Sequence, residues 1–228
     1  MAKKKISRKK LLKTSDEFLT FSARAIIFAR EHSRLFGYLG MVVVGLLLIF
    51  LGINTYLKHV NKKGQEAYNV AYYTMVKNMG PDTKPDELKK SEELFQQVTD
   101  KYGISKAARL ALPELAYINF IQKNYDKAIF QYQQFLDKVA DNDPYQSLAR
   151  MALAVCYEEK GELDKAIRIL KELTSGPDDF FNEQAMLSLA RVYRLAHRQG
   201  ESEEILKEFV DRFKTSPFLP VAKAYLNP

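Results

Sequence analysis

The chain has 228 residues, 46% of them hydrophobic, and its formal net charge at neutral pH is +7. Such a length and apolar content allow a buried core, so the composition excludes a wholly disordered chain. Residues 1–34 hold ten Lys and Arg against three Asp and Glu, whereas residues 58–228 hold 25 of each sign. The excess charge belongs to one terminal segment, which argues against nucleic-acid binding, because that function needs a basic face on a folded unit.

Residues 1–35 form a basic tail whose second half has the pattern of an amphipathic helix. Ser15 is a suitable N-cap, and Asp16 and Glu17 follow it in the first turn. Apolar residues then recur at spacings of three and four, at Phe18, Phe21, Ala25, Phe28 and Ala29. We predict either a helix on the cytoplasmic membrane surface or a helical extension that only positions the next segment.

The segment Phe36 to Leu57 contains 22 residues without a charge, and as a helix it would be about 33 Å long. Because the hydrocarbon core of a bilayer is about 30 Å thick, we predict one transmembrane helix over 36–57. A secretory signal peptide has a shorter apolar core that begins nearer the N-terminus, so the pattern favours an uncleaved anchor.

The basic residues flanking this segment predict its orientation. More Lys and Arg precede it than follow it, where Lys58, Lys62 and Lys63 stand. By the positive-inside rule, the N-terminus is predicted in the cytoplasm of a bacterium, with a single pass through the inner membrane. Residues 58–228 are then expected in the periplasm.

The remainder of the chain contains an internal repeat. Leu153–Tyr157 and Leu189–Tyr193 share the pattern LAxxY at an offset of 36 residues, and Ile169–Leu173 matches Ile205–Phe209 at the same offset. An earlier copy of the second half lies at Tyr125–Ile129, 38 residues before its counterpart. Each unit has helical periodicity on both sides of a break, which predicts a helix, a tight turn and a helix.

These patterns predict an all-α fold, with one transmembrane helix followed by an α-solenoid of about three to four helical hairpins. The expected units are residues 64–105, 106–143, 144–179 and 180–216, followed by a capping helix over 217–228. The first unit is the weakest copy, because its two helices are separated by the extended loop 80–85. Ala154 and Ala166 are expected to let two helices approach closely, and Cys156 is expected to be a buried apolar residue.

The units resemble the tetratricopeptide repeat family over residues 64–228. In the third unit Ala154, Tyr157, Ala166 and Pro177 occupy the family's two small positions, its aromatic position and its proline position. The neighbouring units depart from this pattern, with Asn119 in place of the aromatic residue and Ser202 in place of the second alanine. The resemblance implies stacked hairpins that bind other proteins.

The order of basic tail, single span and extracytoplasmic repeats is similar to the bacterial ancillary subunit of the SecYEG translocon. That resemblance implies a role beside the translocon, in which exported chains are passed to periplasmic chaperones. Two alternatives remain open: a cell-envelope or division scaffold with other partners, and an assembly factor that acts through self-association.

The sequence offers no recognisable catalytic, cofactor-binding or metal-binding constellation, so we expect a protein that is not an enzyme. It has no HExxH, GxSxG or glycine-rich phosphate loop, and its histidines are dispersed at His32, His59 and His197. In a solenoid of hairpins the first helices line the concave surface, where polar and aromatic residues contact a partner. The candidate groove residues are Asn119, Lys123, Arg150, Tyr157, Arg191 and Arg194.

Overall fold

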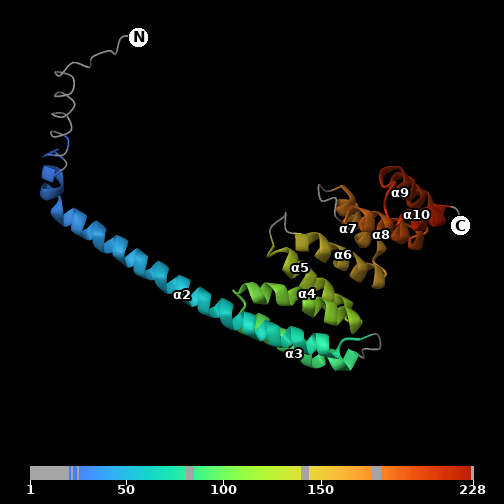
Figure 1. The fold of residues 1–228 in the computed structure, drawn as a ribbon, viewed down its shortest axis with the longest axis horizontal. Helices are drawn as coiled ribbons and strands as arrows, with labels where there is room; N and C mark the ends of the chain where they lie inside the picture. The colour runs from blue at the N-terminus through green and yellow to red at the C-terminus, as the bar shows by residue number, and fades with distance from the viewer. Residues whose placement is uncertain are drawn as a thin grey trace, which may run out of the picture. The chain divides into compact units, whose positions relative to one another are not determined.

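A computed structural model of the protein describes residues 21, 23–24, 26–80, 85–139, 144–175 and 181–226. Every regular element in these ranges is helical, which confirms the predicted all-α class (Figure 1). The helices are α2 (Ser33–Asn78), the short 3₁₀ helix η1 (Pro85–Leu88), α3 (Lys89–Lys101), α4 (Lys106–Ile121), α5 (Tyr125–Leu136), α6 (Pro144–Glu159), α7 (Leu163–Ser175), α8 (Asn182–Leu195), α9 (Gln199–Arg212) and α10 (Leu219–Leu226). The chain divides into two compact units, residues 1–56 and 57–228.

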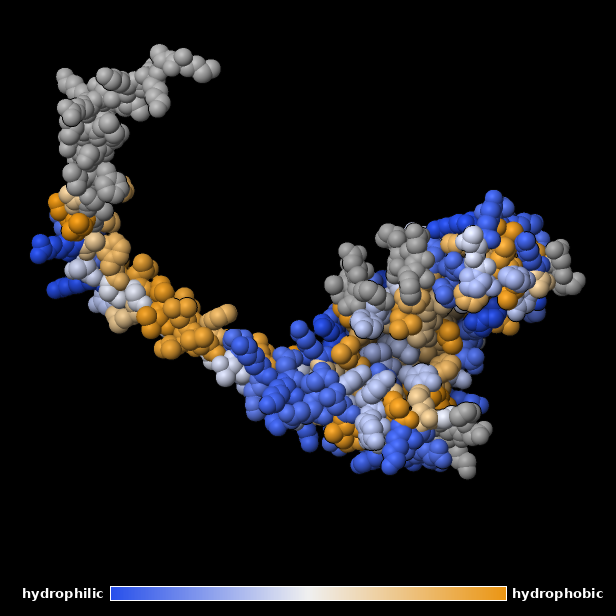
Figure 2. Space-filling view, in the orientation of Figure 1, coloured by the Kyte–Doolittle hydropathy of each residue, from blue (hydrophilic) through white to orange (hydrophobic). Residues whose placement is uncertain are grey.

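The apolar segment forms part of α2, the one described helix that is long and apolar enough to cross a membrane. None of its most apolar stretch is buried, and Figure 2 shows that stretch as a continuous hydrophobic surface. These properties fit a membrane anchor or a signal sequence. The predicted start of the tail helix, including Ser15, Phe18 and Ala25, lies outside the described residues.

The helix that begins with the apolar segment does not end at Leu57 but continues to Asn78. In its last part Val60, Gly64, Ala71 and Met75 are buried, at spacings of four and seven residues. This spacing gives residues 57–78 an apolar stripe that packs in the second compact unit. The same helix therefore supplies both the apolar span and the first helix of the repeat domain.

In the second unit the helices pack as successive antiparallel neighbours. Contacts join α3 to α4, α4 to α5, and so on through α9 to α10, so each helix packs mainly on the helices adjacent in sequence. The interior is built from small and large apolar residues together, such as Ala154 and Ala166 beside Leu170 and Tyr193. The predicted close approach at the two alanines is consistent with their nearly complete burial.

Three hairpins are closed by the same turn. Its central residue has a positive φ of 60° at Lys123, 79° at Gly161 and 57° at His197. The following amide donates a 2.8 Å hydrogen bond to a carbonyl five residues earlier, from Asn124 to Asn119, from Glu162 to Tyr157 and from Arg198 to Tyr193. This is the hydrogen-bond pattern that ends helices at a left-handed residue, and it directs each second helix back along the first.

Cys156 belongs to α6, and its side chain is buried in the core that α6 forms with the neighbouring helices. Burial raises the pKa of its thiol to about 12, so the thiol stays protonated and unreactive at neutral pH. Its predicted role as a buried apolar residue agrees with this environment. Part of the loop predicted at 80–85, and Pro177 at the family's proline position, lie outside the described residues.

Candidate partner-binding pocket

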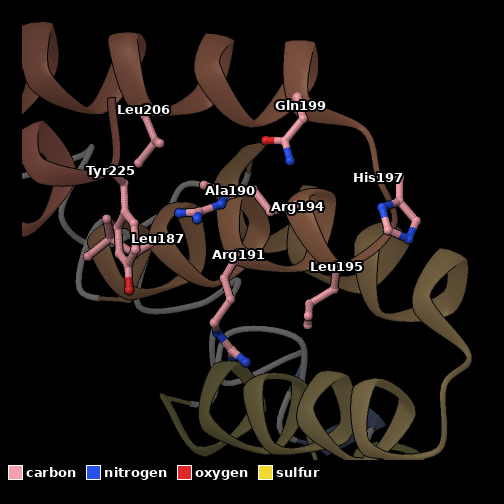
Figure 3. Close-up of a pocket in the computed structure, with 9 residues that line it drawn as sticks. All are labelled: Leu187, Ala190, Arg191, Arg194, Leu195, His197, Gln199, Leu206 and Tyr225. Atoms are coloured by element: carbon pink, nitrogen blue, oxygen red, sulfur yellow. The ribbon is translucent and has the colours of Figure 1, made fainter. Parts of the chain in front are cut away.

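A pocket of about 430 Å³ opens between α8, α9 and α10, within the range of volumes that accommodate small ligands or inserted side chains (Figure 3). Helix α8 supplies most of its wall, because Leu187, Arg191 and Arg194 recur at helical spacing on one face. Tyr225 of α10 and Leu206 of α9 contribute from the other sides. Apolar side chains and two arginines thus line the same pocket.

Helices α8 and α9, which both line the pocket, approach each other closely at Ser202. Ser202 replaces the alanine expected from the repeat pattern, and its buried hydroxyl donates a 2.8 Å hydrogen bond to the carbonyl oxygen of Ala190. This bond satisfies the hydroxyl inside the apolar cluster that also contains Leu206. The substitution of serine for alanine is accommodated by an added helix-to-helix hydrogen bond.

The two arginines of the pocket differ in their partners. Arg191 extends to α6 and makes a salt bridge with the carboxylate of Glu158, whose side chain is mostly buried. Burial raises the pKa of Glu158, although the Arg191 guanidinium opposes that shift. Arg191 is therefore engaged by an acid of the neighbouring hairpin.

Arg194 lies instead over the ring of Tyr225, 4.8 Å from the ring centre (Figure 3). Within the described residues no carboxylate pairs with its guanidinium. A cation on an aromatic face keeps hydrogen-bond donors available to a second ligand. His197 and Gln199 add polar groups at the rim. Chemically, the pocket suits an apolar side chain with a negative group beside it.

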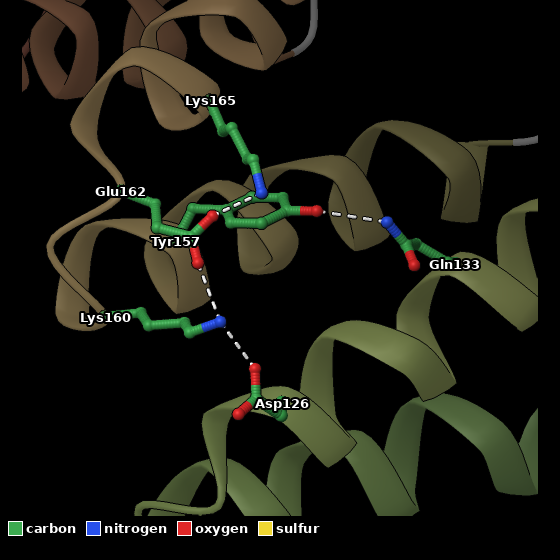
Figure 4. Close-up of polar contacts among 6 residues, drawn as sticks. All are labelled: Asp126, Gln133, Tyr157, Lys160, Glu162 and Lys165. Carbon is green, nitrogen blue, oxygen red and sulfur yellow. Dashed lines mark hydrogen bonds and ion pairs between the residues drawn. The ribbon is translucent and has the colours of Figure 1, made fainter.

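Two of the six residues predicted to line the groove are buried inside hairpins. Asn119 is 0% exposed, and its amide donates to the carbonyl oxygen of Leu115 at 3.0 Å and to Oε1 of Gln131 at 3.2 Å. Tyr157 is 8% exposed, and its hydroxyl accepts a 3.0 Å hydrogen bond from Gln133 (Figure 4). Their burial corrects the expectation that they contact a partner, since both connect the helices of neighbouring elements.

The other four predicted residues are accessible but do not form one site. Arg191 and Arg194 share the pocket. Arg150 faces Glu172 of α7 at 3.7 Å, and Lys123 occupies the left-handed position of its turn. The structure thus brings together one pair of the predicted set, and a partner-binding role for all four stays a prediction.

A network of charges connects adjacent hairpins away from the pocket (Figure 4). Lys160, in the turn after α6, lies 2.6 Å from Asp126 of α5 and 2.7 Å from Glu162. These carboxylates raise the pKa of Lys160, and the lysines on either side lower the pKa of Glu162. Arg198, which follows the left-handed His197 in the next turn, lies 3.7 Å from Asp164 of α7. The arrangement positions one hairpin against the next.

Sequence reasoning missed Tyr225, His197 and the apolar wall of the pocket. One residue could have indicated the apolar wall: Leu195 follows Arg194 at the end of the first helix of its hairpin, and it is exposed in the structure. The sequence does not indicate the contribution of α10, because an eight-residue helix carries no pattern that shows which other helices it packs against. In the described parts of the chain, no group of three or more His, Cys, Asp or Glu could hold a metal ion.

Successive hairpins with small residues at the helix contacts define a helical-repeat protein. The sequence model of the tetratricopeptide repeat-like domain matches residues 36–186, more than half of the chain. The chain therefore belongs to that family. The match begins at the apolar segment and so takes in the apolar helix together with the repeats.

Solved structures support the same fold. A Podosopora anserina chain described as a kinesin light chain with nearly identical TPR-like repeats superposes with a TM-score of 0.56, at 16% identity, over 71% of this chain and 82% of that chain. A variant of it gives a TM-score of 0.57, also at 16% identity, over 74% of this chain and 84% of the other. At this identity the likeness establishes the fold alone.

One curated relative is the RNA polymerase-associated protein CTR9 of Saccharomyces cerevisiae, which is 34% identical over 100 residues. The similarity covers 42% of this chain and 8% of the relative. The chain therefore spans less than a tenth of that protein's length.

Proposed function

We propose that this protein is a membrane-anchored scaffold that binds other proteins through its repeat domain. The observation that carries the proposal is the family match from residue 36, which includes the apolar helix and the repeats in one domain. An anchor confines a binding surface to the membrane, which raises its effective concentration near membrane-bound machinery. The proposal includes no catalytic step.

The charge distribution supports a defined topology. Ten basic residues precede the apolar segment within residues 1–34, whereas the repeat domain carries equal numbers of both signs. In a bacterium this asymmetry would keep the N-terminus in the cytoplasm and the repeats in the periplasm. The partner would then be a periplasmic protein or the periplasmic side of a membrane complex.

The pocket at the end of the repeats is the proposed anchoring point for a partner. An apolar side chain would occupy the space beside Leu187 and Tyr225, and a neighbouring carboxylate would approach Arg194. Because Arg194 has no acidic partner in the described residues, the incoming carboxylate would not displace an existing salt bridge. Buried anchors of this kind dominate binding energy in protein interfaces.

The specific role we propose is that of an accessory subunit of the Sec translocon, which links exported chains to periplasmic chaperones. The test is copurification from gently solubilised membranes, using a tagged full-length chain. Translocon subunits should be recovered with the wild-type protein and with the control Arg168→Glu, on the exposed surface of α7. Arg194→Glu should lose them. Their absence from the wild-type sample would overturn the translocon assignment.

The same experiment separates the alternatives. Recovery of cell-envelope or division proteins in place of translocon subunits, with the same sensitivity to Arg194→Glu, would support a scaffold with other partners. Self-association would be recognised by the mass of the purified protein in a neutral detergent. A monomer at micromolar concentration would exclude an assembly factor that works by stacking its repeat ends.

A further inference from the structure

A half-buried carboxylate lies between α2 and α4 at the start of the repeat domain. Glu114 of α4 accepts a 3.0 Å hydrogen bond from the hydroxyl of Tyr68 on α2. Burial raises the pKa of Glu114 above its ordinary value, and the Tyr68 hydrogen bond opposes this only in part. No lysine or arginine of the described residues forms a salt bridge with it. Glu114 is therefore a carboxylate with a neutral partner and no counter-charge.

Three further tyrosines, on α2, α4 and α6, lie near Tyr68 or on the helix face of Glu114. Tyr68 stacks on Tyr72 one turn along α2, with ring centres 6.0 Å apart and planes inclined by 12°. Tyr117 is three residues after Glu114 on α4, so the two lie on one helix face, and its side chain is 39% exposed. Tyr145, at the start of α6 and 59% exposed, is close enough to influence the hydroxyl of Tyr68. We call these five residues the acid–tyrosine surface.

We propose that the acid–tyrosine surface binds a lysine or arginine side chain from an extended segment of a partner protein. An ammonium or guanidinium group would supply the counter-charge that Glu114 lacks, and its hydrogen bonds would be charge-assisted. The faces of tyrosine rings attract cations, and the methylene groups of a long basic side chain pack against them. An acidic or apolar side chain would leave the carboxylate without compensation.

This surface differs from the pocket in the charge that it selects. Arg191 and Arg194 give the pocket a positive character, whereas the acid–tyrosine surface presents a single carboxylate. The two sites lie on different hairpins, α8–α10 and α2–α6. The inference requires neither the membrane topology nor the translocon assignment, so it can fail or succeed independently of the proposed function.

The test compares two short fluorescent peptides, identical except that one has a central lysine between two leucines and the other has norleucine at that place. Binding to the full-length chain in a neutral detergent is measured by fluorescence anisotropy. The lysine peptide should bind at least about tenfold more tightly than the norleucine peptide. Glu114→Gln should remove this preference, whereas the control Glu93→Gln, at an exposed position of α3, should retain it.

Glu114→Gln is suited to this test because its amide oxygen can still accept the hydrogen bond from Tyr68. Unchanged helical circular dichroism will establish that the variant is folded. Equal affinity of the two peptides would overturn the inference, as would a preference for lysine that survives Glu114→Gln. The absence of measurable binding of the lysine peptide up to millimolar concentration would overturn it as well.

Discussion

At the scale of single residues, the three hairpin turns impose the same backbone conformation on different amino acids. Lys123 and His197 adopt the left-handed conformation that Gly161 adopts without strain. A side chain with a Cβ is strained by about 1 kcal/mol or more in this region. The chain therefore retains local strain in two of the three turns.

This difference predicts that replacing Lys123 by glycine and replacing Gly161 by alanine have opposite effects on stability. Lys123→Gly should stabilise the protein by about 0.5–1 kcal/mol, because relief of strain exceeds the added flexibility of the unfolded chain. Gly161→Ala should destabilise it by about 1 kcal/mol for the converse reason. Urea denaturation monitored by circular dichroism measures both. A lower denaturation midpoint for Lys123→Gly would contradict this account of the turns.

The burial of Glu114 predicts how the stability of the protein depends on pH. Because its pKa is raised in the folded state, ionisation costs more there than in the unfolded chain. The cost is absent below the ordinary pKa of about 4.5, grows as pH rises from there to the raised folded-state pKa, and is constant above it. Glu114→Gln should therefore increase the free energy of unfolding at pH 7 and have little effect near pH 4. An equal effect at both pH values would exclude burial as the cause.

The interior residues were the most predictable from sequence. Ala154, Ala166 and Cys156 follow from the repeat spacing, because a hairpin buries the same positions in each copy. The salt bridge between Arg191 and Glu158 was not predictable, because its partners belong to different hairpins and lie 33 residues apart. Asn119 was misinterpreted for a related reason: its amide is satisfied by Gln131 on the next helix, which a pattern within one helix does not indicate.

At the scale of helices, periodicity predicted the hairpins, but it did not predict where α2 ends. The apolar segment suggested a boundary at Leu57, yet no residue between Lys58 and Asn78 breaks a helix, and a buried stripe continues. The division of the repeats into units 64–105, 106–143, 144–179 and 180–216, with a cap over 217–228, remains our proposal. It is supported by the turns at Lys123, Gly161 and His197, which lie within the last three of these units.

The sequential packing of helices predicts that a core mutation acts locally. Phe209 of α9 is 0% exposed in a cluster formed by α8, α9 and α10. Phe209→Ala should lower local stability by about 3–5 kcal/mol. In hydrogen exchange, α8–α10 should lose protection while α3 and α4 keep theirs, because repeats contact mainly their neighbours.

Phe130→Ala is the matched control, since Phe130 is an exposed phenylalanine of α5. It also removes a phenylalanine side chain, but without opening a cavity. Hydrogen exchange should therefore be nearly unchanged in all helices. Uniform loss of protection across all helices in Phe209→Ala would show that the domain unfolds as one cooperative unit.

At the scale of the whole molecule, the family match, the apolar helix and the uneven charge support one arrangement. The basic tail would lie on the cytoplasmic side, the apolar part of α2 would cross the inner membrane, and the repeats would act in the periplasm. This topology stays a prediction from composition and charge, which apply to whole segments through bilayer thickness and the positive-inside rule. The identity of the partner depends on side chains from several helices and was not accessible in this way.

The most direct test is the protease accessibility of the repeat domain in intact spheroplasts and in lysed ones, with a tag at the C-terminus. We predict that protease added to intact spheroplasts degrades the tagged domain, while a cytoplasmic marker protein survives. Protection of the domain until the spheroplasts are lysed would place the repeats in the cytoplasm, and it would contradict both the topology and the periplasmic scaffold function.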